Sequence, residues 1–211
     1  MDAVTSAFAL FQKGGLVMYP LLICSIIVVT VAVERFLFYR AAETDIDGLL
    51  AGLSPKLDKG DRAGALTVCR GAKGLAATVL TEGLKHDYAD NRGLENALSG
   101  AASLAAASLR ERVNYLDTIV TLAPLLGLLG TVFGMISSFS VMNIRFGQPQ
   151  AITGGVGEAL VATAAGLLVA VLALVVHSYY VHRLNIMITG IERCCTYLLD
   201  AFSRSDKLET A

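Results

Sequence analysis

The side chains that could take part in chemistry inside the apolar parts of this chain are a few hydroxyls and one carboxyl group. Thr131 and Ser137 lie in one long apolar stretch, and Glu158 and Thr163 lie in another. A hydroxyl can donate or accept a hydrogen bond without a fixed charge. A Thr in a helix can also satisfy its hydroxyl on its own backbone, so a single Thr does not define a site.

Ionisable side chains are missing from the middle of both stretches. Asp117 stands at one edge of the first stretch and Glu158 near one end of the second. A charge facing lipid costs several kcal/mol, so Glu158 should face protein or water, or pair with Arg145 at the interface. A proton path needs a titratable carrier, so if protons cross here, the acid must come from another chain.

Three stretches are long enough to cross the hydrocarbon layer, which takes about 20 residues. They are Leu16–Val33, Leu116–Met142 and Val156–Val181. Mean hydropathy is +0.61 and only 17% of residues are charged, which is unusual for a soluble domain. No basic segment precedes the first stretch and no small-residue cleavage site follows it, so we interpret it as a retained helix. The sequence therefore predicts an all-α integral membrane protein with three transmembrane helices.

Small residues recur at helical spacing in the second and third stretches. Gly127, Gly130 and Gly134 share one helical face, and Gly130 and Gly134 form a GxxxG pair. In the third stretch a similar stripe includes Gly166. Such stripes usually mark close helix–helix contacts in membranes. We assign these four glycines and Pro124 to helix packing.

Lys and Arg gather in the long middle region and after the third stretch, which predicts that both are cytoplasmic and that the N-terminus is outside. The predicted segments are 1–15, an outer interfacial helix; 16–39, transmembrane helix 1; 40–115, a cytoplasmic helical region; 116–142, transmembrane helix 2; 143–155, an outer loop; 156–181, transmembrane helix 3; and 182–211, a cytoplasmic helix and tail.

The middle region shows no alternating strand pattern and predicts a bundle of helices. Ser54-Pro55 and Gly60-Asp61 are the expected helix starts, and Ala76–Tyr88 is expected to be helical. From Asn91 onwards we find no strong breaker before Pro124, so one helix of about 70 Å is predicted to run into the second stretch. The third stretch is predicted to continue likewise as a helix through Arg183 towards Leu199.

The most specific pattern is Leu122–Phe139, L-A-P-L-L-G-L-L-G-T-V-F-G-M-I-S-S-F. It resembles the A-P-L-L-G-L-L-G-T-V-x-G block of the MotA/TolQ/ExbB proton channel family, where Trp often stands in place of Phe133. Gly157–Ala170 is similar to the family's third-span signature, and G-G-L-V-M-Y-P-L-L with E-R-F to its first. The resemblance is to the ExbB/TolQ branch and covers nearly the whole chain.

The resemblance implies a five-fold ring in the bacterial inner membrane, around the single transmembrane helices of an ExbD/TolR-like partner. That partner would contribute the titrating Asp, and a TonB/TolA-like protein would receive the energy of proton flow. Thr131 and Thr163 would line the lumen, Glu158 would match the family's outer-end Glu, and we place Ser137 on the same pathway. The resemblance leaves open the choice between an ExbB, a TolQ and a gliding-type role, and between H⁺ and Na⁺.

Other classes of function remain as alternatives or are excluded. A non-conducting membrane scaffold predicts that the intramembrane hydroxyls are dispensable, and a self-sufficient channel or transporter conflicts with the missing mid-membrane charge. The net charge of −1 argues against nucleic acid as a partner. We find no catalytic motif, so we expect no enzyme activity, no metal and no cofactor. The four cysteines form no CxxC pattern, and we interpret them as structural.

Overall fold

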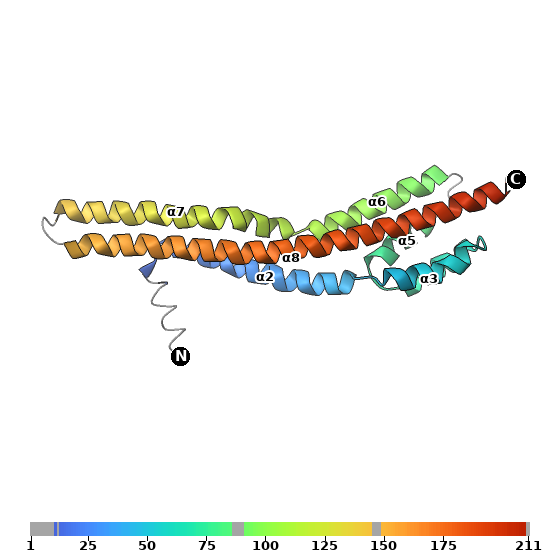
Figure 1. The fold of residues 1–211 in the computed structure, drawn as a ribbon, viewed down its shortest axis with the longest axis horizontal. Coiled ribbons are helices and arrows are strands. Elements are labelled where there is room, and N and C mark those ends of the chain that lie inside the picture. Colours follow the sequence, from blue (N-terminus) through green and yellow to red (C-terminus); the bar gives the residue numbers. More distant parts are fainter. Residues whose placement is uncertain (1–10, 12, 86–90, 145–148, 210–211) are drawn as a thin grey trace, which may run out of the picture. The chain divides into compact units, whose positions relative to one another are not determined.

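The structure is a computed structural model that describes residues 11, 13–85, 91–144 and 149–209. The described residues form helices and no strand (Figure 1). The helices are α2 (Met18–Ala42), α3 (Ile46–Leu57), α4 (Arg62–Gly71), α5 (Leu75–Lys85), α6 (Asn91–Arg110), α7 (Val113–Ile144) and α8 (Pro149–Glu209). They form two compact units: unit 1 comprises 1–34 and 112–179, and unit 2 comprises 35–111 and 180–211.

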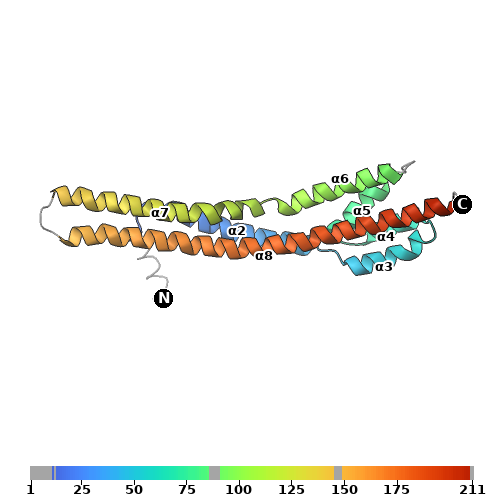
Figure 2. The same cartoon turned by 45° about the horizontal axis from the view of Figure 1, so that its top comes forward.

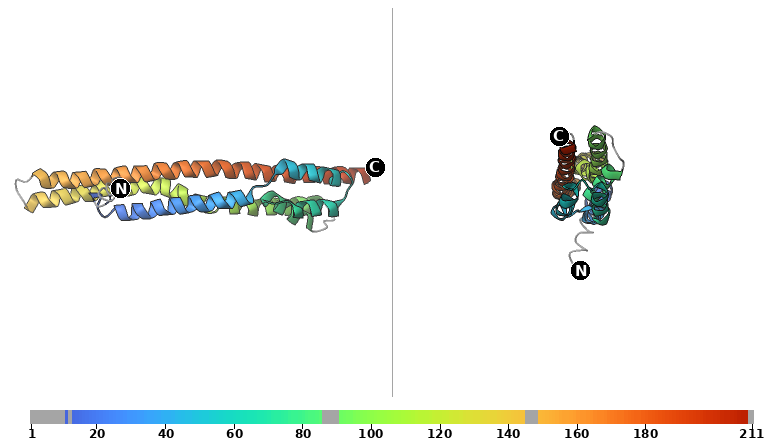
Figure 3. Two further views of the ribbon diagram at one scale, coloured as in Figure 1. Left: turned by 90° about the horizontal axis from the view of Figure 1, so that it is seen from below. Right: turned by 90° about the vertical axis from the view of Figure 1, so that its right-hand side faces the viewer.

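Unit 1 contains the apolar parts of α2, α7 and α8. Within it, α7 and α8 lie side by side as an antiparallel pair (Figures 1 and 2). The first part of α2 runs beside this pair (Figure 3), and a Cβ on Gly130 would stand 3.7 Å from the Cβ of Val17, the residue just before α2. The three helices are long and apolar enough to cross a membrane, and only 28% of each apolar window is buried within the chain. The remaining surface must therefore face lipid or other chains.

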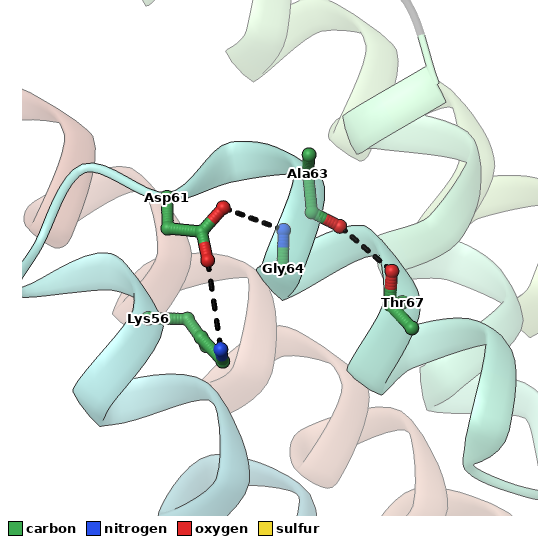
Figure 4. Close-up of polar contacts among 5 residues, drawn as sticks. All are labelled: Lys56, Asp61, Ala63, Gly64 and Thr67. Carbon is green, nitrogen blue, oxygen red and sulfur yellow. Dashed lines mark hydrogen bonds and ion pairs between the residues drawn. The ribbon is translucent and has the colours of Figure 1, made fainter.

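Unit 2 packs α3, α4, α5 and α6 with the C-terminal part of α8 (Figure 2). Its core contains leucines that recur at helical spacing, such as Leu49, Leu53 and Leu57 of α3, together with buried Ala and Cys side chains. Two acidic side chains begin two of these helices. Asp45 accepts a hydrogen bond from the backbone N–H of Gly48, and Asp61 from that of Gly64. Asp61 also pairs with Lys56 at 3.5 Å, which ties the start of α4 to the end of α3 (Figure 4).

The expected helix start at Ser54-Pro55 is wrong, because both residues lie inside α3. The helix begins earlier because Asp45 caps it and because Leu49, Leu53 and Leu57 bury one face at a spacing of four residues. The other two expectations for this region agree with the structure within the described residues. Asp61 caps α4, and α5 covers the described part of the third expected helix.

The predicted uninterrupted helix from Asn91 into the second apolar stretch is also wrong. It ends at Arg110 as α6, and α7 begins at Val113, with Arg112 between them at φ 66°. A left-handed conformation at a residue other than Gly stops helix propagation. The side chain of Arg112 pairs with Glu34 at 3.3 Å.

One further boundary differs from the sequence prediction. α8 begins at Pro149, so the part of the expected outer loop from 149 to 155 is helical. The expected continuation of the third stretch is present, because α8 runs without interruption to Glu209. Most of the expected interfacial helix at 1–15 lies outside the described residues.

Candidate functional site

Thr163 lies on α8 at the contact between α7 and α8. Its hydroxyl donates to the carbonyl of Ala159 in its own helix and to the carbonyl of Gly127 in α7, each at 3.1 Å. The side chain is half-buried. Thr163 therefore bridges two helices through a single shared proton.

Small residues make this bridge possible. A Cβ on Gly127 would stand 3.1 Å from the Cα of Thr163, which is tighter than ordinary contact. A Cβ on Gly166 would stand 2.6 Å from the carbonyl oxygen of Ala123, the residue before Pro124 in α7. Both glycines are thus required by the close approach of the two backbones.

The GxxxG pair lies at the same contact. A Cβ on Gly130 would meet the Cβ of Ala162 at 2.5 Å. A Cβ on Gly134 would meet the carbonyl oxygen of Gly155 at 2.7 Å. The four glycines assigned to packing and Pro124 accordingly all belong to the two helices that form this pair.

Thr131 is half-buried, one helical turn along α7 from Gly127. Its hydroxyl donates to the carbonyl of Leu128 at 2.6 Å. The hydroxyls of Thr131 and Thr163 are therefore both engaged as donors to backbone carbonyls. Each oxygen retains lone pairs that can accept a hydrogen bond.

Ser137 is exposed on α7, whereas its neighbour Ser138 is 3% exposed. Ser138 donates to the carbonyl of Gly134 at 2.9 Å and faces Gly155 of α8. Sequence reasoning chose Ser137 for the pathway and missed the buried position of Ser138. The signal was available, since Ser138 continues the small-residue face one turn beyond Gly134.

Glu158 is half-buried near the start of α8. Its carboxylate lies against Gly15, and a Cβ on that glycine would occupy the same space. Gly15 has φ +69° in the turn that leads into α2. The carboxylate thus faces protein, as the cost of exposing it to lipid requires. Arg145, its alternative partner, lies outside the described residues.

Three cysteines of unit 2, Cys69, Cys194 and Cys195, are buried and are expected to react slowly. Burial raises the pKa of Cys69 and of Cys195 to about 11, with a smaller contribution from Cys194 in both cases. Their thiols are therefore protonated at neutral pH and react slowly. Within the described part of the chain, no group of three or more His, Cys, Asp or Glu is placed to hold a metal ion.

The geometry thus presents two hydroxyl oxygens near one helix pair, with no Asp, Glu, Lys or Arg between Asp117 and Arg145 or between Glu158 and Arg183. The two threonine hydroxyls can accept hydrogen bonds but have no acidic proton near neutral pH, and His177 lies 14 residues beyond Thr163 on α8. Any proton transfer along these hydroxyls requires a group from elsewhere.

Comparison with known proteins places this arrangement in a family. An ExbB-like biopolymer transport protein of Synechocystis is 38% identical over 79% of this chain and 67% of its own length. The Tol-Pal system protein TolQ of Haemophilus influenzae is 31% identical over 53% of this chain and 48% of its own length. The biopolymer transport protein ExbB of Salmonella typhimurium is 28% identical over 59% of this chain and 55% of its own length.

The family profile described as the MotA/TolQ/ExbB proton channel family matches residues 72–193. This range includes α7 and the part of α8 that carries Glu158, Thr163 and Gly166. The chain belongs to the MotA/TolQ/ExbB proton channel family, in its ExbB/TolQ-like branch.

Proposed function

We propose that this chain is the ring subunit of an inner-membrane motor driven by the proton-motive force. A single-span partner of the ExbD/TolR kind supplies the titrating Asp, and the pair conducts protons and transmits energy to the cell envelope. The observation that supports this most strongly is the neutral middle of α7 and α8, which offers hydroxyls but no ionisable carrier. The chain's membership of a proton channel family supplies the other half of the argument.

The hydroxyls have a defined chemical role in this proposal. Since Thr131 and Thr163 already donate to backbone carbonyls, they offer an incoming carboxyl group only acceptor lone pairs. An acceptor stabilises the protonated, neutral acid, which can donate, rather than the carboxylate. The two threonines therefore hold the partner's Asp in its protonated form while it passes through the membrane.

The ring itself is supported by the exposed apolar surface of unit 1. With 28% of each apolar window buried, one copy cannot enclose a lumen, and further copies and a partner helix must cover the inner faces. We propose a pentamer. The N-terminus and the turn between α7 and α8 are placed outside, and unit 2 in the cytoplasm, because Lys and Arg concentrate there.

The driven system is of the TonB-dependent transport or Tol type, and the ion is H⁺. Relatives named for biopolymer transport and for the Tol-Pal system support these two kinds of driven system. The membrane potential supplies about 2.3 kcal/mol per charge per 100 mV, so a few protons suffice for a conformational step.

The experiment replaces Thr163 with Val, which keeps the shape and removes the hydroxyl. With the single-span partner present, we expect proton flux into vesicles to fall by about tenfold, because one lost hydrogen bond raises the barrier by about 1.4 kcal/mol. Thr163→Ser should retain the flux. Thr118→Val is the matched control, since the exposed Thr118 hydroxyl donates only to Asn114 of its own helix.

A non-conducting scaffold is the alternative, and one observation favours it. Both hydroxyls are satisfied within the chain, as they would be in a purely structural role. The scaffold predicts that Thr163→Val leaves proton flux unchanged while the oligomer stays intact. That result would remove the hydroxyls from the mechanism.

A further inference from the structure

Unit 2 contains a groove of about 470 Å³ between α6 and the C-terminal part of α8. On the α6 side its wall includes the small residues Ala102, Ser103 and Ala106. The charged residues Glu95, Arg110 and Glu192 also line the groove. Ile191 of α8 contributes apolar surface opposite them. A groove walled by alanine and serine leaves room for a larger apolar side chain from outside.

The other side of α6 carries such a side chain. Leu104 is 74% exposed, while Leu94, Leu98 and Leu109 of the same helix are each at most 2% exposed. Burial of a leucine side chain is favourable, so an isolated exposed leucine is a candidate contact residue. Its helical neighbours Gly100 and Ala107 are small and exposed, which makes Leu104 a protruding knob.

Helix geometry separates the knob from the groove. At 100° per residue, Leu104 lies about 160° round α6 from Ala102 and from Ala106. One helix therefore presents a knob on one face and a groove wall on nearly the opposite face. Two such different surfaces on one subunit allow a head-to-tail contact that repeats from copy to copy.

We propose that Leu104 of one copy inserts into the α6–α8 groove of the next copy. This inference rests on the proposed ring and identifies which surfaces close it outside the apolar unit. In a ring whose rotation axis runs parallel to α6, equivalent residues of all copies lie at the same height along that axis. Leu104 of one copy therefore lies at nearly the same height as Ala102 and Ala106 of its neighbour.

The charges agree with this arrangement. Glu111 directly follows α6, and its backbone N–H still donates to the carbonyl of Ala107 as in a helix. Helical spacing therefore places Glu111 about 20° from Leu104, on the knob side. Arg110 lines the groove at the same level. In the ring, the knob side of one copy thus brings Glu111 next to Arg110 of the neighbouring copy, and the two opposite charges attract each other.

The test is a disulfide that one chain cannot form alone. In the double variant A102C/L104C the two Cβ atoms point to opposite sides of one helix, so any bond between them must join two copies. Both double variants also carry Cys195→Ala, because Cys195 lines the same groove as Ala102 and could otherwise form a disulfide within one chain. Oxidation of the otherwise full-length protein in membranes should give a ladder of cross-linked species on non-reducing gels. The control pair T67C/A102C moves the knob cysteine to the exposed Thr67 on α4 and should give no ladder.

Light scattering of the wild type in detergent is measured alongside. A ladder with A102C/L104C and none with T67C/A102C supports the docking. An oligomeric wild type without the A102C/L104C ladder overturns the docking but leaves the ring. A monomeric wild type without a ladder overturns both the docking and the ring.

Discussion

The chemistry of the proposed pathway depends on which atom of each threonine is already engaged. A shared donor bond from Thr163 to Gly127 and Ala159 uses the hydroxyl proton and leaves the oxygen. The oxygen therefore distinguishes a protonated carboxyl group from a carboxylate. This selectivity for the neutral acid could not be derived from the sequence, because spacing alone does not show where a hydroxyl proton points.

At Gly15 we expect substitution by Ala to lower the melting temperature in detergent. The positive φ costs a residue with a Cβ about 1–2 kcal/mol, and the carboxylate of Glu158 must also move. Gly157→Ala is the control, because nothing lies within 4 Å of a Cβ there and Ala favours the helix. An equal or higher melting temperature for Gly15→Ala would show that Glu158 does not occupy this position.

The buried cysteines predict a loss of stability at alkaline pH. Burial raises the pKa of Cys69 from 9.0 to about 11, so the folded protein retains a proton that the unfolded chain releases. Stability is therefore full below pH 9 and falls as the pH rises from 9 towards 11. The measurement is the free energy of unfolding against pH for wild type and Cys69→Ala. The free energy of unfolding of Cys69→Ala should fall less between pH 9 and 11 than that of the wild type. If the two curves fell in parallel, the raised pKa of Cys69 would be contradicted.

At the scale of helices, side chains of α2 donate hydrogen bonds to the last turn of α6, just before the helix break. Arg35, which is 3% exposed, donates to the carbonyl of Ser108 at 3.2 Å, and the hydroxyl of Tyr39 donates to that of Leu109 at 2.8 Å. These carbonyls lie in the last turn of α6, where helical partners are missing. The E-R-F sequence thus has a structural role: α2 caps α6.

Tyr39→Phe tests this cap. We expect the free energy of unfolding to fall by about 1–3 kcal/mol, because the buried carbonyl of Leu109 loses its donor. The aromatic ring and its edge contact with Tyr180 at 5.5 Å are retained. The control is Tyr115→Phe, a change at a 62% exposed tyrosine, which should shift stability by less than about 0.5 kcal/mol. Equal effects of the two substitutions would exclude the cap.

For the whole chain, hydrophobic periodicity was sufficient to predict the helical class and three apolar helices, and the blocks Leu122–Phe139 and Gly157–Ala170 indicated the correct family. Hydrophobic periodicity did not predict the helix break at Arg112. The ion pair with Glu34 and the hydrogen bond from Arg35 at this break come from α2, which is distant in sequence. Ser137 stays a prediction for the pathway, and the burial of Ser138 could have been predicted from its spacing of four residues from Gly134. The groove on α6 also required knowledge of which helix packs beside it.

The central proposal is that this chain supplies a neutral sleeve and that its partner supplies the acid. The most direct test is proton uptake by vesicles under a membrane potential, with this chain alone, with the single-span partner, and with that partner's intramembrane Asp replaced by Asn. We predict uptake above background only with the unaltered partner. Equal uptake by this chain alone would contradict the proposal.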